Sequence, residues 1–268
     1  MRGSGRQRLA DAVVGGCFIV ALLVAWELAG DAGWISGYRF PVPSKLADAG
    51  WELATAGFPD GVTIWTHFVV TLARILQGFA LALVTAIPLG ILIGRVAILD
   101  WMTLPLITFA RSIATLSLLP LVITWFGAGE LAKVLLIAYG CFWVMLTQAI
   151  AAVKYVDPIY IRAAQTLETS QSDIFVRVIL PAALPRMFAG ARTALGVGFM
   201  VIVGAEMIGT VKGLGALVME ARRFYRTDLT IAGMVTIGLL GFGISIVLQW
   251  LERRLLPWSR GIEDVRRT

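Results

Sequence analysis

The chain has 268 residues, of which 58% are hydrophobic and only 15% are charged, and its mean hydropathy is +0.83. Soluble domains are nearer half apolar and a quarter charged, so a water-soluble core cannot bury this much apolar surface, and membrane lipid must cover the rest. The net charge of +6 argues for nucleic acid only in a soluble protein, whereas here Lys and Arg lie mostly between apolar runs. The composition therefore predicts an all-α, polytopic membrane helix bundle and no nucleic-acid partner.

Six apolar segments are long enough to cross the hydrocarbon core, which takes about 20 residues. In chain order they are Ala12–Ala29, Phe68–Ile93, Trp101–Trp125, Leu131–Val153, Pro185–Ile208 and Leu229–Leu251. The first follows Arg2, Arg6 and Arg8, as in a signal peptide, but it is longer than a signal core. We therefore expect it to be a retained first helix.

The charges between these segments predict the orientation of the chain. With a cytoplasmic N-terminus, the inner regions collect thirteen Lys and Arg residues and the outer loops seven, which agrees with the positive-inside rule. The predicted organisation is a cytoplasmic N-terminus and first transmembrane helix over 1–30, a periplasmic loop over 31–66, a transmembrane domain over 67–251, and a cytoplasmic tail over 252–268.

The long outer loop contains a helix signal. Phe40-Pro41-Val42-Pro43 is an extended lead-in, because proline disfavours helical backbone in the residue before it. Ser44 then stands where a hydroxyl caps the start of a helix. We expect a short periplasmic helix from Ser44 to Gly57.

The inner connection over 154–184 is also long and organised. Asp157-Pro158 is typical of a helix start, with the aspartate as cap and the proline as first helical residue. Two apolar stripes follow at helical spacing, and the second ends at Pro181, so we expect two short amphipathic helices. They form either a docking platform or a helix pair lying in the headgroup region.

Several motifs, in order, resemble one transporter family. The run Arg162-Ala163-Ala164-Gln165-Thr166-Leu167-Glu168, followed by Leu180-Pro181, resembles the "EAA" loop of binding-protein-dependent ABC importer permeases. Further matches resemble the nitrate/sulfonate/taurine branch, closest to taurine-type permeases. These matches are Phe40-Pro41-Val42-Pro43-Ser44, Thr71-Leu72-Ala73-Arg74, Leu119-Pro120-Leu121, Trp125-Phe126-Gly127, Ala205-Glu206 and Gly213-Leu214-Gly215.

The resemblance implies the type I ABC importer permease fold in a bacterial inner membrane, with a second copy of the chain completing the pathway. Two ATP-binding subunits would dock on 154–184, here called the coupling loop, and a periplasmic binding protein would deliver substrate. The residues implied in coupling are Arg162, Ala163, Ala164, Leu167, Glu168 and Pro181. The implied substrate is a small anion or zwitterion such as taurine, a sulfonate or nitrate.

Three residues depart from the family's pattern. Arg162 replaces an acidic residue, Glu168 replaces a glycine, and Ala114 replaces a common proline. A glycine at 168 would end the first short helix with a positive φ. With Glu168, either the helix continues or the turn is strained. With Ala114, we expect a milder break in the third span.

Two charged residues are candidates for the substrate pathway or its gate. Arg111 either faces a water-filled pathway, or the third helix begins late and the side chain snorkels to the headgroups. We expect Arg74 and Arg192, near span ends, to snorkel as well. Glu206, beside Gly213-Leu214-Gly215, either gates the pathway or holds this turn by accepting backbone hydrogen bonds.

The sequence carries no motif for ATP hydrolysis or metal chemistry. Gly209–Gly215 lacks the phosphate-binding pattern, His67 is the only histidine, and Cys17 and Cys141 stand alone in apolar runs. We therefore expect no enzyme activity, no cofactor and no metal. The competing classes are a self-sufficient secondary transporter, which would show two repeated halves, and an intramembrane enzyme, which would need a catalytic constellation.

Overall fold

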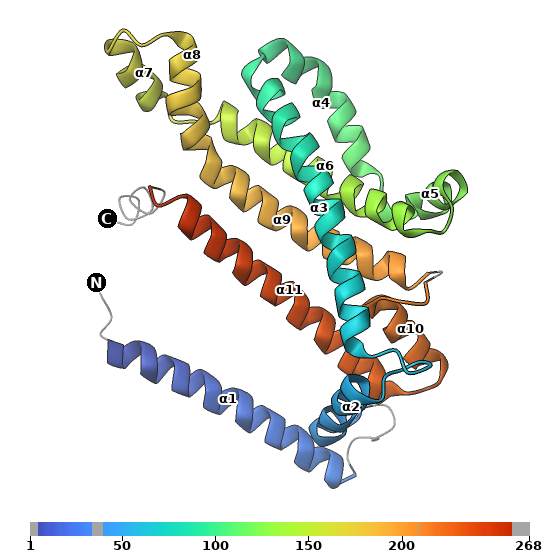
Figure 1. Ribbon diagram of the computed structural model, residues 1–268. Helices are drawn as coiled ribbons and strands as arrows, with labels where there is room; N and C mark the ends of the chain where they lie inside the picture. Colours follow the sequence, from blue (N-terminus) through green and yellow to red (C-terminus); the bar gives the residue numbers. More distant parts are fainter. Residues whose placement is uncertain (1–4, 34–39, 209, 259–268) are drawn as a thin grey trace.

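The computed structural model describes residues 5–33, 40–208 and 210–258, and these residues form helices and no strand (Figure 1). The elements are α1 (Gly5–Asp31), α2 (Pro43–Thr55), α3 (Ile64–Arg95), α4 (Ala97–Ser112), the 3-10 turn η1 (Thr115–Leu118), α5 (Leu119–Phe126), α6 (Glu130–Lys154), α7 (Pro158–Thr166), α8 (Gln171–Ile174), the π-helical η2 (Phe175–Ile179), α9 (Leu180–Glu206), α10 (Leu214–Arg223) and α11 (Thr227–Leu255). The all-α class is confirmed. The predicted tail beyond residue 258 lies outside the described residues.

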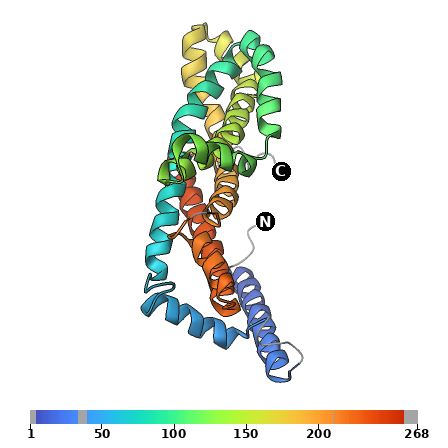
Figure 2. The same cartoon turned by 90° about the vertical axis from the view of Figure 1, so that its right-hand side faces the viewer.

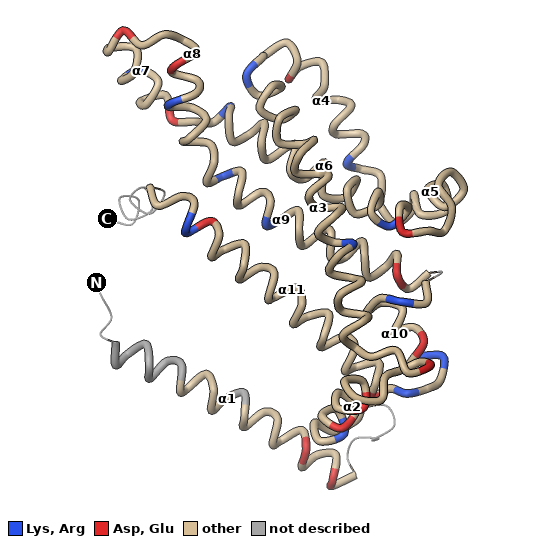
Figure 3. The backbone as a smooth tube through the Cα atoms, viewed as in Figure 1, with Lys and Arg blue, Asp and Glu red and all other residues tan. Residues whose placement is uncertain are grey.

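Five of the described helical stretches are long and apolar enough to cross a membrane. They are α1, α3, α6, the continuous run from α8 through α9, and α11; a bent pair of helices, α4 and η1–α5, makes a sixth crossing if it counts as one span. Figure 3 shows charged residues near the ends of α6 and α11, with long uncharged stretches between them. The predicted polytopic bundle of about six spans is confirmed.

The bundle is elongated and has two distinct ends (Figures 1 and 2). Both views place α7 and α8 at one end, here the α7 end, and α2 and α10 at the other, here the α10 end. Between the ends, α6 packs against α3 and α9, whereas α1 lies apart and meets the bundle at α2. In the predicted topology the α7 end is cytoplasmic and the α10 end periplasmic, and this orientation stays a prediction.

The contact between α3 and α6 forms the centre of the core. Glycines on α3 let the two backbones approach, as small residues do in membrane helix pairs. A Cβ atom added to Gly90 would stand 2.5 Å from the Cβ atom of Ala149 and 3.0 Å from the carbonyl oxygen of Leu146. Fully buried side chains from α3, α6 and α9 fill the layer around this contact: Ile75, Leu136, Ile137, Met145, Leu146, Leu195 and Ile202.

The predicted third span, Trp101–Trp125, is not a single helix. The backbone of Ile113 and Ala114 is extended, and the chain resumes at 81° to α4. The Tyr139 hydroxyl donates a 3.0 Å hydrogen bond to the carbonyl of Ala110 in the last turn of α4, which also accepts from the backbone N–H of Ile113 at 3.3 Å. Two extended residues therefore end α4 without a proline, and whether this break is milder than one with proline at position 114 stays a prediction.

Pro181 does not end a second short helix, contrary to the prediction. α8 continues through η2 into α9, so that Gln171–Glu206 is one 36-residue stretch. A proline removes one N–H from the ladder, and a π-helical turn just before it shifts the hydrogen-bonding pattern locally. Pro181 follows this π-helical turn by two residues, and its carbonyl accepts a hydrogen bond from the Trp258 indole at 3.4 Å.

The short helix of the outer loop is present, but Ser44 lies inside it instead of capping it. Pro43 takes the first helical position, and Val42 precedes the helix without a side-chain cap. The Ser44 hydroxyl and backbone N–H both donate to the Glu27 carboxylate, at 2.6 and 3.1 Å. Ser44 therefore attaches α2 to α1.

We predict that Gly90→Ala destabilises the bundle and that Gly196→Ala on α9 does not. At Gly90 the added methyl group must push α3 away from α6, and overpacking of this kind costs about 1–3 kcal/mol. A Cβ atom at Gly196 meets no atom within 4 Å, so the better helix propensity of alanine is the only effect there. The measurement is the midpoint of thermal unfolding in detergent, and equal midpoints for both variants would contradict the close packing of α3 on α6.

Candidate functional sites at the two ends of the bundle

The coupling loop folds into helical turns separated by a strained corner. The Asp157 carboxylate accepts a 2.9 Å hydrogen bond from the backbone N–H of Ile159, which confirms the predicted helix cap. α7 ends at Leu167, and Glu168 has a φ of +55°. Of the two alternatives for the missing glycine, the strained turn is the correct one, at a cost of about 1–2 kcal/mol for a side chain in this conformation.

The residues implied in ATPase docking do not all face outward. Ala163 and Leu167 are exposed, and Leu167 leaves 79% of its surface accessible. Arg162 and Glu168 are also exposed, and within the described part of the chain neither forms an ion pair. Ala164, in contrast, is buried. The exposed members of this set, here called the docking face, are Arg162, Ala163, Leu167 and Glu168.

Two contacts fasten the coupling loop to the corner between α3 and α4. The Lys154 ammonium lies 2.5 Å from the Asp100 carboxylate, and the Arg95 guanidinium lies 4.4 Å from the centre of the Phe175 ring in η2. A small apolar cluster, separate from the main core, joins α6 to α9 beside them: Ala149, Ala152, Val153, Val156, Ala183 and Met187. Because α4 begins at this corner, a displacement of the loop acts directly on α4.

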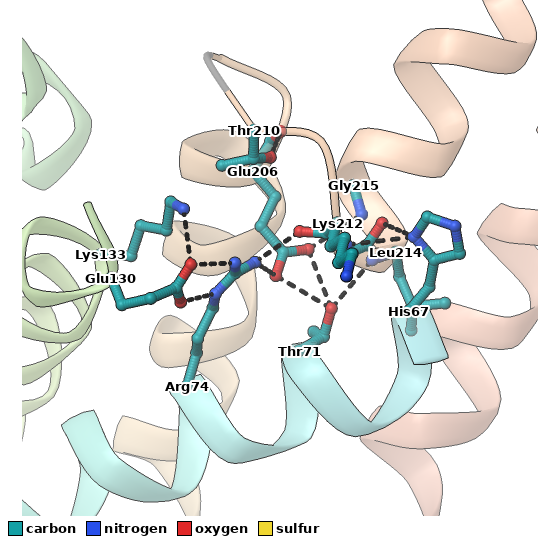
Figure 4. Close-up of polar contacts among 11 residues, drawn as sticks. His67, Thr71, Arg74, Glu130, Lys133, Glu206, Thr210, Lys212, Leu214 and Gly215 are labelled. Carbon is teal, nitrogen blue, oxygen red and sulfur yellow. Dashed lines mark hydrogen bonds and ion pairs between the residues drawn. The ribbon is translucent and has the colours of Figure 1, made fainter. Parts of the chain in front are cut away.

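A buried polar network joins α3, α6 and the turn between α9 and α10 (Figure 4). The Arg74 side chain is only 5% accessible, and its Nε and Nη2 atoms donate to Glu130 at 2.5 and 2.6 Å. Its Nη1 atom donates to Glu206 at 2.7 Å. The predicted snorkelling of Arg74 is therefore wrong, because the guanidinium points inward between two carboxylates.

Glu206 also binds the turn that precedes α10. Its carboxylate accepts from the backbone N–H of Gly215 at 3.0 Å and from the Thr71 hydroxyl at 2.9 Å, and the Thr71 oxygen accepts from the N–H of Leu214 (Figure 4). Gly213 has a φ of +134°, and a Cβ atom there would stand 2.5 Å from Glu206 Oε1, so only glycine fits. This geometry matches the alternative in which Glu206 holds the turn.

His67 ties the start of α3 to the same turn. Its Nε2 atom lies 3.2 Å from the carbonyl of Phe58. Its Nδ1 atom lies 3.1 Å from the backbone nitrogen and 2.9 Å from the carbonyl oxygen of Gly213. The ring can therefore accept from the N–H of Gly213 when Nδ1 is bare, or donate to its carbonyl when Nδ1 carries the proton.

Sequence reasoning missed the members of this network on α3, although a signal for them exists. His67, Thr71 and Arg74 follow one another at intervals of four and three residues, which places them on one face of a helix. A polar stripe on an otherwise apolar span indicates a face turned toward protein. Their partners, Glu130 and Glu206, lie 56 and 132 residues from Arg74 in sequence, and no local pattern pairs them.

The other two arginines inside predicted spans differ from each other. Arg192 on α9 forms an ion pair with Glu252 on α11, so its partner is a carboxylate and not the headgroup region. Arg111, in the last turn of α4, is exposed, and no acidic partner reaches it within the described residues. Arg111 is thus the unpaired charge at the point where α4 breaks.

The chemistry available in the described residues is that of binding and movement. No group of three His, Cys, Asp or Glu side chains among them could hold a metal ion. At the α10 end of the bundle, one open hollow of about 350 Å³ lies between α2 and the start of α11, and two of about 490 and 240 Å³ border α10. The arrangement therefore offers an exposed docking face at one end and a fixed polar turn at the other.

Comparison with known proteins gives consistent matches over most of the chain. A family described as "Binding-protein-dependent transport system inner membrane component" matches residues 86–260. The taurine transport system permease protein TauC of Escherichia coli (strain K12) is 36% identical over 248 residues, covering 91% of this chain and 89% of the relative. The bicarbonate transport system permease protein CmpB of Synechococcus elongatus is 29% identical over 259 residues, covering 94% of this chain and 92% of the relative.

A solved structure supports the same fold. An inward-facing conformation of the MetNI methionine ABC transporter matches with a TM-score of 0.59, covering 72% of this chain and 96% of the matched chain. The identity is 20%, so this likeness shows the fold alone. It confirms the predicted importer permease fold.

These matches decide between the three predicted classes. They support an ABC transport permease, in which ATP hydrolysis belongs to a partner ATPase, and they support neither a secondary transporter nor an intramembrane enzyme. The apolar helices make the chain a multi-pass membrane protein. The chain belongs to the family of binding-protein-dependent transport system inner membrane components.

Proposed function

We propose that this chain forms the substrate pathway of an ATP-driven importer in a bacterial inner membrane and carries a small anion or zwitterion such as taurine, a sulfonate or bicarbonate. It works as a homodimer with two ATP-binding subunits on the coupling loop and a periplasmic binding protein at the α10 end. Permeases named for taurine and bicarbonate among its relatives support this substrate class.

One observation carries the coupling part of the proposal. The docking face projects from the α7 end, while the contacts of Lys154 with Asp100 and of Arg95 with Phe175 bind the same loop to the start of α4. A push on the docking face therefore reaches a helix that breaks at 81° within the bundle. Rigid movement of such an element is the usual way in which a docking event is transmitted.

We predict that Leu167→Asp abolishes ATPase binding. An unpaired carboxylate in an apolar contact loses its hydration without compensation, at a cost of several kcal/mol, so ATPase affinity should fall about 100-fold or more. Ala164→Asp is a poorer test, because Ala164 is buried and the variant would disrupt the loop itself. The measurement is co-purification of the ATPase with the detergent-solubilised permease.

Val211→Asp is the matched control, since Val211 is 77% exposed at the opposite end of the bundle. It introduces the same charge on a similar exposed apolar residue and should leave ATPase binding unchanged. Undiminished ATPase binding by Leu167→Asp would contradict the assignment of Leu167 to the docking face. Equal losses of ATPase binding in both variants would indicate a general defect in folding.

A role for Arg111 in the pathway follows from its lack of a partner. A guanidinium within the hydrocarbon region is stable only beside water, carbonyls or an anion. Arg111 stands at the break of α4 with no carboxylate to neutralise it among the described residues. In a dimer, two such residues would make the pathway electropositive and favour an anionic substrate.

We predict that Arg111→Gln lowers anion uptake at least tenfold and that Arg111→Lys recovers part of it, because lysine keeps the charge. One lost charge-assisted hydrogen bond, about 1.5–3 kcal/mol, accounts for a change of that size. The measurement is the initial rate of uptake at equal membrane expression. Equal uptake in both variants would mean that Arg111 only snorkels.

We predict that Arg74→Ala lowers stability far more than Glu130→Gln. Removing Arg74 leaves Glu206, which is 1% exposed, as a buried unpaired charge, and breaking such a pair costs about 3–5 kcal/mol. Glu130 is largely solvent-accessible, so its loss should cost about 1 kcal/mol or less. Thermal unfolding of both variants in detergent is the test, and similar losses would argue against Glu206 as the holder of the turn.

A further inference from the structure

The break between α4 and α5 lies against one stretch of α6. The Tyr139 hydroxyl on α6 reaches the carbonyl of Ala110 at 3.0 Å, and Ala110 directly precedes Arg111. A Cβ atom added to Gly140 would lie 3.5 Å from the side-chain oxygen of Thr115 in η1. α6 therefore lines both sides of the break, the end of α4 and the start of η1.

This part of α6 is at mid-depth in the bundle. Tyr139 and Trp143 lie about 14 and about 20 Å from the start of α6, at 1.5 Å per residue. The helix has 25 residues, so both are far from either end. Their rings pack edge to face with centroids 5.8 Å apart, which places the Trp143 indole one helical turn from the contact between Tyr139 and α4.

Trp143 carries a hydrogen-bond donor that has no acceptor. Its indole Nε1 atom is buried without a partner in the described structure. The only other side-chain nitrogen in this condition there is Nε of Arg192, whose guanidinium already binds Glu252 through another nitrogen. An unmet donor at such depth is unfavourable, so it indicates an acceptor that arrives from outside the chain.

Three side chains at the break offer donors that no acceptor among the described residues occupies. Arg111 offers its guanidinium, Trp143 its indole N–H, and Thr115 a hydroxyl that forms no hydrogen bond among the described residues. The Tyr139 hydroxyl already donates its hydrogen bond to the carbonyl oxygen of Ala110. A carboxylate is absent from the contacts of these four residues in the described chain. Groups of this kind bind an anion with several acceptor oxygens.

We propose that the break between α4 and η1, with Tyr139 and Trp143 of α6 as its wall, is an oxyanion-binding site of the transport pathway. The Trp143 N–H and the Arg111 guanidinium donate to the oxygens of a sulfonate or a similar small oxyanion while it crosses the membrane. The inference rests on the proposed function and adds the residues that recognise the substrate. Trp143 acts here by touching the substrate and not by supporting the fold.

The test is Trp143→Phe, which removes the N–H and keeps an aromatic ring against Tyr139. The permease is reconstituted in proteoliposomes with its ATPase subunits and binding protein, and uptake of taurine, a sulfonate and bicarbonate is measured under ATP. Because the binding protein sets the dependence on external concentration, the maximal rate is the informative quantity. It should fall about tenfold in Trp143→Phe, as expected for one hydrogen bond to a charged group.

Controls separate a lost contact from a folding defect. Trp65→Phe changes an exposed tryptophan at the start of α3 and should leave uptake unchanged. The thermal unfolding midpoint of Trp143→Phe should equal that of the wild type. Thr115→Val, a second variant of nearly the same shape, should lower the maximal rate of uptake in the same direction.

The outcomes distinguish this inference from the proposed function. Wild-type vesicles that import none of the three probes would overturn the proposed substrate class itself. Wild-type import together with full import by both Trp143→Phe and Thr115→Val would overturn the oxyanion site and leave the importer assignment intact. Loss of import only in variants that also unfold earlier would likewise overturn it, since the role would then be structural.

Discussion

The hydrocarbon core offers no hydrogen-bond partners, so every polar group at that depth needs a partner inside the protein or in its pathway. This constraint explains where the chain stays regular and where it does not. The uninterrupted helices α3, α6 and α11 satisfy their own backbones over long uncharged stretches. Where α4 breaks, a hydroxyl from α6 donates to a carbonyl in the last turn of α4. Where Arg74 is buried, two carboxylates supply the charge balance.

The same constraint gives the two ends of the bundle different kinds of stabilising contact. At the α10 end, Glu206, Thr71 and Arg74 bind one another and the turn before α10, so this end is fixed by buried hydrogen bonds. At the α7 end, two partly exposed polar contacts and a small apolar cluster hold the coupling loop, and the docking face is exposed. The close packing of α3 on α6 connects the two ends.

Much of this arrangement is predictable from local patterns, and the failures share a physical cause. Apolar length predicts the spans, and Asp157-Pro158 predicts the start of α7, because both depend on residues close in sequence. The sharp break at Ala114 and the inward position of Arg74 depend on Tyr139, Glu130 and Glu206, which come from distant parts of the chain. Periodicity within one segment carries no information about such partners. The family resemblance predicted the fold, and it carried no information on these contacts.

Three arginines within the predicted spans differ in whether a carboxylate of the same chain forms an ion pair with them. Arg74 lies between Glu130 and Glu206, and Arg192 binds Glu252, so a permanent carboxylate already occupies each of these guanidinium groups. A passing anion would have to displace a tethered carboxylate, whose effective concentration is far higher than that of a free solute. Arg111 has no such competitor among the described residues, and it stands where the backbone of α4 is interrupted. An interrupted helix beside an unpaired cation is tolerated in a membrane where it lines a path for solute or water, and the proposed function therefore assigns recognition to the break and stability to the paired charges.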